Sequence, residues 1–331
     1  MKEVLDKLFR HQTLQKQEAQ KTLINLANGE YNNSQMASFL TVYSMRSITV
    51  EELEGFREAM LSLCIRVDLD DFNTVDLCGT GGDGKDTFNI STLSSFVAAG
   101  AGLKVTKHGN YGVSSTCGSS NLLESFGCRF NNDIDTIKMS IDQSGICFLH
   151  APMFHPAMKN IAPIRRELGV KTFFNMLGPM VNPSFPKNQM VGVFSLELAR
   201  LYGYLYQKSN INFSIVHALD GYDEISLTGD FKVISNDAEL IYSPEDIGLG
   251  RWSKKSLFGG DTIEEASKIF LSVLENTGED AHKQVVLANA GLSISVVKEI
   301  NIKNGISTAR ESLESGAALK AFKKFIAINQ G

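Results

Sequence analysis

The sequence predicts an α/β protein, in which a small helical domain precedes a larger α/β domain with a central, mostly parallel sheet flanked by helices. Residues 1–66 carry helical patterns only, whereas short apolar strands alternate with helices from Asn73 onward. Such alternation is typical of parallel sheets covered by helices. With 331 residues, 43% of them hydrophobic, the chain can bury a sizeable core. We therefore expect a helical domain over residues 1–66 and an α/β domain over residues 72–331.

The helical part contains three start signals. Thr13 can cap a helix that ends near Gly29, and Ser34 can cap a second helix. Thr49 and Glu52 have the spacing of a capping box, which marks the start of a third.

The second of these helices places Phe39, Leu40 and Tyr43 on one apolar face. Helices of this length cannot bury such a face alone. The face either packs within the chain or forms a contact between two subunits, and the sequence leaves both possibilities open.

The stretch from Asn73 to Ser120 organises the rest of the chain. It predicts a strand at Thr74–Cys78, a glycine loop at Gly79–Gly84 and a helix that Asn89 or Ser91 can cap. A second strand at 103–107 and a Ser/Gly-rich turn follow. Further helices are expected at 133–143, 155–168, 172–177, 196–208, 262–276, 280–297 and 306–328, and further strands at 146–149, 190–194, 213–218 and 232–234.

The glycine loop matches neither of two common nucleotide motifs. The dinucleotide fingerprint requires an acidic residue after the second strand, where this chain has Lys107. The phosphate loop of ATPases requires Ser or Thr after its lysine, where Asp86 follows Lys85. A loop of bare N–H groups before a helix can still bind an anion, although a simple tight turn is the alternative.

The charges around this loop favour an anion. Between Asp86 and Glu124 there is no acidic residue, whereas Lys104, Lys107 and His108 lie there. Loops that follow parallel strands gather at one edge of a sheet, so Lys107 should face the glycine loop. The alternative for Lys107 is a solvated strand end.

An acidic pair, Asp223–Glu224, follows Gly221 and Tyr222. Carboxylate oxygens suit Mg²⁺, which commonly shares its ligands with substrate phosphates. Adjacent residues on a regular strand point to opposite faces, so joint metal binding requires either a loop here or two ions. Taken alone, such an acidic pair is more often a solvated turn.

Arg165–Arg166 lies on an expected helix after Pro163. Neighbours on a helix diverge by about 100°, so only one of the two guanidinium groups should face a site. A guanidinium group can bind a carboxylate through two parallel hydrogen bonds. A surface pair balanced by Glu167 is the alternative.

Composition excludes several function classes. The formal charge of −5 gives no reason to expect nucleic-acid binding. Five cysteines, none spaced as CxxC, argue against a disulfide framework and against structural zinc. The sequence shows neither a signal peptide nor a run of 18 apolar residues, so we expect no membrane association and a cytoplasmic location.

Together, the motifs GTGGD, NIST, KHGN, SSTCGSS, HPAMKNIAPIRRELG, FNMLGPMVNP and GYDEISLTG, in this order, resemble the anthranilate phosphoribosyltransferase family of tryptophan biosynthesis. The resemblance extends from the N-terminal helices to about Gly260. It implies Mg²⁺-dependent transfer of the phosphoribosyl group of phosphoribosyl pyrophosphate (PRPP) to the amine of anthranilate, with release of pyrophosphate. It also implies a homodimer joined through the helical domain, a return of residues 160–180 to that domain, and an active site between the two domains.

The same resemblance implies roles for individual residues. Lys107 and Arg165 are the catalytic candidates, and Ser91, Asp223 and Glu224 the metal ligands. Anthranilate would bind to Gly79, His108, Asn110 and Arg165. PRPP would bind to Gly79, Gly82, Asp83, Thr87, Asn89, Ile90, Ser91, Thr92, Lys107, His108, Gly109, Asn110, Tyr111, Gly112, Val113, Ser114, Ser115 and Ser119.

Two alternatives stay open at this point. Pyrimidine nucleoside phosphorylases resemble the same architecture but use free phosphate and need no acidic pair. A nucleic-acid-binding relative should carry a basic face and lack the Asp223–Glu224 pair.

Overall fold

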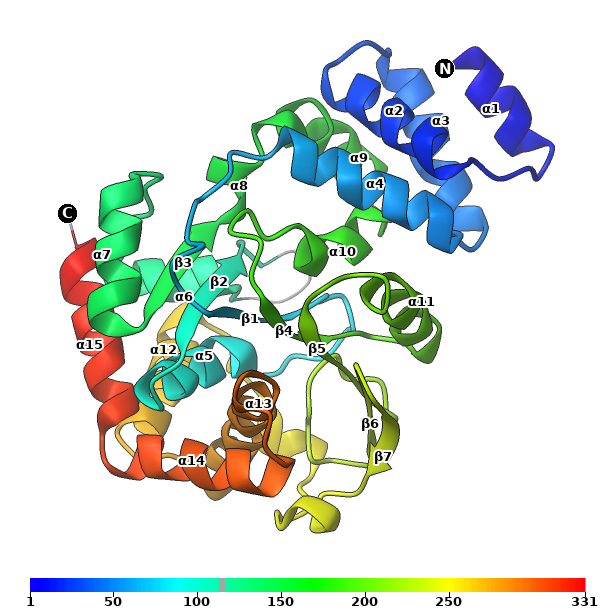
Figure 1. Cartoon of the computed structure of the whole chain (residues 1–331). Helices are drawn as coiled ribbons and strands as arrows, with labels where there is room; N and C mark the ends of the chain where they lie inside the picture. Colours follow the sequence, from blue (N-terminus) through cyan, green and yellow to red (C-terminus); the bar gives the residue numbers. More distant parts are fainter. Residues whose placement is uncertain (113–116, 331) are drawn as a thin grey trace. The chain divides into compact units, whose positions relative to one another are not determined.

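The computed structural model describes residues 1–112 and 117–330, and the chain divides into two compact units (Figure 1). The helical unit consists of Met1–Arg66 and Pro152–Pro183. The sheet unit consists of Val67–Ala151 and Ser184–Gly331. The segment that returns to the helical unit is longer than the 160–180 expected from the sequence.

The helical unit contains α1 (Lys2–Phe9), α2 (Lys16–Ala27), α3 (Asn33–Met45), α4 (Val50–Leu63), the 3-10 turns η1 (Pro156–Asn160) and η2 (Gly178–Val181), α9 (Ala162–Leu168) and α10 (Phe174–Leu177); α8 (Ala151–Phe154) spans the boundary. Helix α1 was not expected. Its eight residues make little more than two helical turns, which is too short for the apolar periodicity to stand out in the sequence. The expected helix over 155–168 is wrong. Pro163 has no N–H for the helical ladder, and the segment divides into η1 and α9.

Of the three expected caps, only the Thr49–Glu52 capping box is confirmed. Helix α2 begins after Gln15 rather than Thr13, without a side-chain cap. Helix α3 begins after Asn32 rather than Ser34, because Asn32 and Gln35 form a capping box. Ser34 cannot form one, since Ala37 stands three residues later.

The apolar face of α3 packs inside the helical unit. Phe39 and Leu40 are fully buried and Tyr43 nearly so. The Phe39 ring lies edge-on to those of Tyr43 and Phe56, with centroids 5.1 and 5.9 Å away, and Phe56 stacks on Phe173 at 4.5 Å. The interpretation of this face as a subunit contact is therefore wrong, because the returning segment supplies the Phe173 ring that covers it.

Glu52 is a buried carboxylate at the centre of this unit. It accepts hydrogen bonds from Leu14 N–H at 2.9 Å and Tyr43 O–H at 3.0 Å, and its Oε1 lies 2.5 Å from Arg46 Nη2. Burial acts to raise the pKa of Glu52, but the bonds from Arg46, Leu14 and Thr49 outweigh it and hold this pKa below its ordinary value. The charged form of Glu52 therefore stabilises the folded chain.

We expect Glu52→Gln to lower the free energy of unfolding by about 2–3 kcal/mol at pH 7, because Arg46 then loses its charged partner. A carboxyl group whose pKa is lower in the folded chain stabilises the fold at pH values above its unfolded-state pKa. This stabilisation is lost as the pH falls through the folded-state pKa. Urea denaturation should therefore show the gap to wild type narrowing from pH 7 to pH 3. Glu51→Gln removes the same charge from an exposed site and should change little; equal losses for both variants would contradict the assignment.

Among the described residues, the sheet unit has a seven-stranded sheet of order β3-β2-β1-β4-β5-β6-β7. The strands are β1 (Thr74–Gly79), β2 (Lys104–Gly109), β3 (Ile146–His150), β4 (Asn188–Gly192), β5 (Asn212–Ala218), β6 (Phe231–Ser235) and β7 (Glu239–Tyr242). The first five run parallel to one another, β6 runs antiparallel to its neighbour β5, and β7 runs antiparallel to β6. Strand β4 starts earlier than expected because its first residue is polar yet buried: Asn188 Nδ2 donates to Thr74 O at 2.9 Å.

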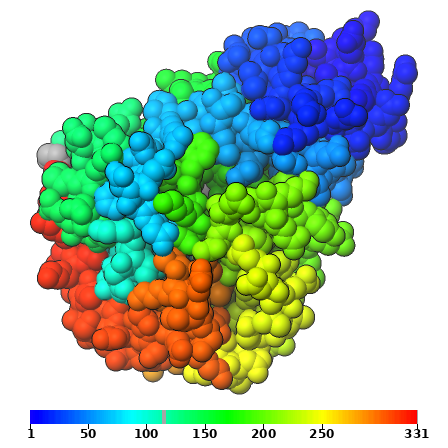
Figure 2. All heavy atoms as spheres, in the orientation of Figure 1, coloured from blue at the N-terminus to red at the C-terminus, as the bar shows by residue number. Residues whose placement is uncertain are grey.

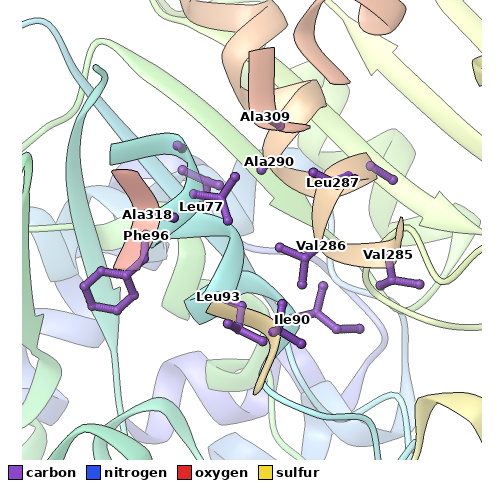
Figure 3. Close-up of a cluster of buried hydrophobic side chains, with 14 of the residues drawn as sticks. Leu77, Ile90, Leu93, Phe96, Val285, Val286, Leu287, Ala290, Ala309 and Ala318 are labelled. Atoms are coloured by element: carbon purple, nitrogen blue, oxygen red, sulfur yellow. The ribbon is translucent and has the colours of Figure 1, made fainter. Parts of the chain in front are cut away.

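The helices of this unit are α5 (Ile90–Gly100), α6 (Ser119–Ser125), α7 (Ile134–Ser144), α11 (Leu196–Tyr206), α12 (Ile263–Leu274), α13 (Asp280–Lys298), α14 (Ile302–Glu314) and α15 (Ala317–Asn329), with the 3-10 turns η3 (Glu245–Ile247) and η4 (Lys254–Leu257). Leu93 and Phe96 of α5 lie in a core with Leu77 of β1 and Val286 of α13 (Figure 3). The α/β class with a mostly parallel sheet flanked by helices is confirmed.

Two differences from the expected helices remain. The helix expected at 306–328 is two helices, α14 and α15, on the surface of the sheet unit (Figure 2, orange to red). Between them Gly316 has φ +77, which ends one helix and starts the next. Helix α6 lies where only a Ser/Gly-rich turn was expected. Within the described residues, no single helix is long and apolar enough to cross a membrane; α13 and α14 meet that test only as a pair, bent by 115°.

Candidate active site

Three loops of the sheet unit carry most of the predicted site. The glycine loop follows β1, the loop residues 110–112 follow β2, and the acidic loop follows β5. These strands are parallel, so their carboxyl ends meet at one edge of the sheet, where α/β proteins bind ligands.

The acidic pair is hydrogen-bonded to the other elements of this edge. Asp223 Oδ2 accepts from Gly81 N–H of the glycine loop at 2.6 Å. Glu224 Oε1 accepts from Ser91 N–H in the first turn of α5 at 2.9 Å. The pair lies in a loop rather than on a regular strand, so both carboxylates reach the same region.

Two glycines make room for Asp223. A Cβ at Gly79 would lie 2.3 Å from Asp223 Oδ2, and a Cβ at Gly192 would lie 1.4 Å from Asp223 O. Any side chain at either position would displace the acidic loop. Gly79 was singled out from the sequence, whereas Gly192 was missed; its signal is a glycine at the end of a buried strand.

Lys107 lies beside Ser91. The side chain is 2% exposed, and Nζ donates to Leu77 O at 2.8 Å and to Ser91 Oγ at 3.3 Å. Burial lowers the pKa of Lys107, and the nearby Asp76 carboxylate opposes that shift. The structure thus brings together the predicted lysine, a metal-ligand candidate and, through the Ser91 N–H, Glu224.

The carboxylates at this site repel one another. Burial and then the charge of Asp83 raise the pKa of Asp223 to about 7. Burial and then the charges of Asp223 and Asp83 raise the pKa of Glu224 well above its usual range. A bound divalent cation would relieve this repulsion, so the donor set fits Mg²⁺.

In the part of the chain that the structure describes, no three His, Cys, Asp or Glu side chains are grouped to hold a metal by themselves. Asp223 and Glu224 could therefore hold Mg²⁺ only with further oxygen ligands. The Ser91 hydroxyl offers one such oxygen, and Mg²⁺ commonly shares its remaining ligands with phosphate groups.

The loop after β2 is closed by a residue that the sequence analysis gave no role. Asn121 Oδ1 accepts from Gly112 N–H at 3.0 Å and from Gly118 N–H at 3.1 Å, and so joins these two residues. Asn110 O accepts from Ser119 Oγ at 3.3 Å. Three predicted contacts, Val113, Ser114 and Ser115, lie outside the described residues.

The predicted residues at the start of α5 differ in what they can offer. Asn89 occupies the N-cap position but makes no side-chain cap; its Nδ2 donates to Cys117 O at 2.9 Å. The expected cap by Asn89 or Ser91 is therefore wrong, because the loop carbonyl takes the Asn89 amide. Ile90 and Thr92 have buried side chains, so a ligand could reach them only through main-chain groups.

Other predicted residues frame the same loops. Asp83 Oδ1 accepts from Lys85 N–H at 3.0 Å, and Thr87 forms a β-bridge with Phe258. Gly82 has φ +74 within the glycine loop.

Three further predicted residues lie at the end of β2 and just after it. His108 is nearly buried, and its N–H donates to Asp76 Oδ1 at 3.3 Å. Gly109 lies against Ser119, where a Cβ would come within 2.4 Å of Oγ. Tyr111 is 41% exposed, and its hydroxyl donates to Glu124 Oε1 at 2.7 Å.

Arg165 belongs to the helical unit. Its Nη2 lies 3.4 Å from Asn175 Oδ1, and its guanidinium carbon lies 5.2 Å from the centre of the Phe174 ring. Burial lowers the pKa of Arg165, while Arg166 is exposed. Within the described residues Arg165 pairs with no carboxylate, so its charge is available to an anionic ligand.

Comparisons with known proteins agree on the family to which this chain belongs. Residues 71–319 match the α/β domain of a glycosyl transferase family, and residues 2–64 match its helical bundle domain. The anthranilate phosphoribosyltransferase of Flavobacterium psychrophilum is 61% identical over 98% of each chain. That of Thermus thermophilus has a similar structure, with a TM-score of 0.92, 32% identity and 99% of each chain covered. A Saccharomyces cerevisiae structure of the enzyme in complex with PRPP and Mg has a TM-score of 0.90 and 28% identity, covering 98% of this chain and 96% of that one.

Proposed function

This chain belongs to the anthranilate phosphoribosyltransferase family, and from that membership we propose its reaction and the roles of its residues. The enzyme transfers the phosphoribosyl group of PRPP to the amine of anthranilate, giving N-(5-phosphoribosyl)anthranilate and pyrophosphate in tryptophan biosynthesis. The chain covers 98% of a relative of that name at 61% identity, which supports this assignment.

The observation that carries the proposal is the arrangement around Ser91. Its hydroxyl accepts from the Lys107 ammonium group, and its N–H donates to Glu224. A cation, a helix N-terminus and a carboxylate suited to Mg²⁺ thus meet at one residue. Such a combination favours a ligand with several phosphate charges.

Lys107 and the N-terminus of α5 stabilise the departing pyrophosphate. The amine of anthranilate is a weak nucleophile, so the barrier falls mainly when the leaving group and the positively charged ribosyl centre are stabilised. Both groups are held in place before substrate arrives, so little reorganisation is needed. No strong general base is required, and none is assigned.

Asp223, Glu224 and Ser91 would hold Mg²⁺ together with the pyrophosphate of PRPP. When bound, Mg²⁺ neutralises charge on the leaving group. A structure of the Saccharomyces cerevisiae enzyme in complex with PRPP and Mg supports this assignment at the level of the family.

The remaining contacts follow from the motifs. The glycine loop and the loop after β2 offer N–H groups and hydroxyls to PRPP. Arg165 binds the anthranilate carboxylate, with Gly79, His108 and Asn110 as further contacts. The guanidinium group of Arg165 is largely removed from water and, within the described residues, pairs with no carboxylate, which supports this role.

Arg165→Ala should raise the KM for anthranilate far more than the KM for PRPP, because a lost carboxylate contact mainly removes ground-state binding of one substrate. The expected cost is about 1.5–3 kcal/mol, the range for a hydrogen bond to a charged group. Steady-state kinetics with each substrate varied in turn measures this. Arg166→Ala is the matched control; equal effects on both substrates, or a larger effect at Arg166, would overturn the assignment.

The reaction itself is tested by the loss of anthranilate fluorescence on mixing with PRPP and Mg²⁺. Thymidine with phosphate is the parallel assay for a nucleoside phosphorylase. Phosphorolysis without phosphoribosyl transfer would refute the proposed function.

A cytoplasmic location and a homodimer joined through the helical unit are further proposals. Exposed apolar residues of that unit, such as Met45 at 81% and Val170 at 59%, support a subunit contact away from the buried face of α3. Light scattering on the purified chain measures its oligomeric state.

A further inference from the structure

A hollow of about 460 Å³ lies beside the glycine loop, on the sheet unit. Its lining includes Lys85, Lys254, Lys255, Tyr222 and Phe258, and we call it the lysine hollow. None of the roles assigned above uses these five residues, although Thr87, a proposed PRPP contact, also lines the hollow. We propose that the lysine hollow is a second anion site, which binds a diphosphate group outside the Ser91–Lys107 centre.

The charges of the hollow favour an anion. Its lining holds three ammonium groups against the one carboxylate of Asp86. Within the described residues, none of the three lysines forms a salt bridge. The Lys85 ammonium lies 4.9 Å from the centre of the Tyr222 ring. A cation over an aromatic ring keeps its full charge, so all three remain available to a ligand.

The walls of the hollow are fixed by main-chain bonds. The segment that carries Lys254 and Lys255 pairs with the end of the glycine loop: Phe88 N–H donates to Leu257 O at 3.2 Å, and Gly259 N–H donates to Asp86 O at 3.0 Å. The β-bridge between Thr87 and Phe258 lies between these two bonds. The lysines therefore project from a framework rather than from a free loop.

The position of the hollow indicates where its ligand comes from. Tyr222 directly precedes the metal-ligand candidate Asp223, and Lys85 directly follows Gly84 of the glycine loop. Pyrophosphate released at the centre would meet this hollow next. The inference that the ligand is released pyrophosphate rests on the proposed function. The inference that the hollow binds an anion rests only on its charges and its main-chain framework.

A diphosphate group can also be part of a nucleotide. Phe258 is 46% exposed and offers an aromatic face on which a base could stack. The shared chemistry is the diphosphate, and the two sources are distinguished by comparing pyrophosphate with ADP.

The test titrates inorganic pyrophosphate into the full chain in EDTA, followed by calorimetry. An exposed charge pair changes affinity by a factor of about 2 to 5, so Lys85→Gln with Lys254→Gln and Lys255→Gln should weaken binding about tenfold or more. Lys320→Gln with Lys323→Gln and Lys324→Gln removes three exposed charges from α15 and should leave binding unchanged. The Lys107→Ala chain should retain the binding, because the hollow does not include Lys107.

Equal pyrophosphate affinity in wild type and in the hollow variant would overturn the proposal, as would loss of binding in Lys107→Ala alone. If ADP binds only as tightly as pyrophosphate, the diphosphate group alone accounts for binding. If ADP binds more tightly and Phe258→Ala abolishes that gain, the ligand is a nucleotide. Turnover measurements separate the proposed function from the proposed second anion site. The hollow variant should keep its kcat. A chain that binds pyrophosphate in the hollow but makes no product would refute the function, not the site.

Discussion

Lys107→Ala should lower kcat by about 10²- to 10³-fold, the range for losing one preorganised group that stabilises transition-state charge. The Lys107 ammonium lies against the Ser91 hydroxyl in a buried setting, where an electrostatic contact is stronger than in water. Negative charge on the leaving pyrophosphate grows in the transition state, and the attraction of the lysine grows with it. Steady-state and single-turnover kinetics with PRPP and anthranilate measure the effect.

Lys85→Ala is the matched control for this variant. Lys85 follows the glycine loop, but its ammonium group lies over the Tyr222 ring, so its removal should leave kcat within about twofold of wild type. A larger loss of kcat at Lys85 than at Lys107 would restore the phosphate-loop interpretation that Asp86 argues against.

The sequence predicted the elements that carry local signals. The strand, glycine loop and helix around Gly79–Ser91 are present, as is the acidic loop, because turn residues and apolar periods are read directly from neighbouring positions. The roles of the polar side chains follow from the family resemblance and are proposals.

What the sequence could not supply depends on contacts between distant segments. Gly192 is needed because the Asp223 main chain, 31 positions later, passes where its Cβ would lie. The burial of Phe39 depends on Phe173 from the returning segment. Asn121 closes its loop only because two separate N–H groups converge on one oxygen. For Gly192 the only local signal is a glycine at the end of a buried strand, and the contacts of Phe39 and Asn121 have no local signal.

Replacing Asp223 with Asn and Glu224 with Gln together should cause a steep loss of activity at low Mg²⁺. The two carboxylates are useful to catalysis only if a divalent ion links them to the phosphates of PRPP. The amides keep the size of the side chains and remove two charges. Excess Mg²⁺ should restore part of the rate, because the ion can arrive with the pyrophosphate and bind the weakened site. Rate measured against Mg²⁺ concentration for both proteins tests this expectation.

The same double variant should be more stable than wild type in the absence of metal. The pKa of Asp223 is raised above the ordinary value of 3.8, chiefly by burial, and that of Glu224 is raised as well. A carboxyl group whose pKa is higher in the folded chain than in the unfolded chain destabilises the fold as pH rises above the unfolded-state pKa. The reason is that ionisation of the group is less favourable in the folded chain. At pH 8 in EDTA the amides avoid this cost, and the melting temperature should rise by several degrees, the shift that corresponds to about 1–2 kcal/mol.

These two measurements together distinguish a metal site from a structural pair. If Asp223 and Glu224 served only the fold through their bonds to Gly81 and Ser91 N–H groups, the double variant would be less stable and its Mg²⁺ curve would overlap that of wild type. Full wild-type activity in EDTA would likewise remove the metal role and favour a phosphorylase. A variant that is more stable without metal, yet needs more Mg²⁺ for turnover, is expected only if the buried carboxylates are kept at a cost to stability in order to bind a cation.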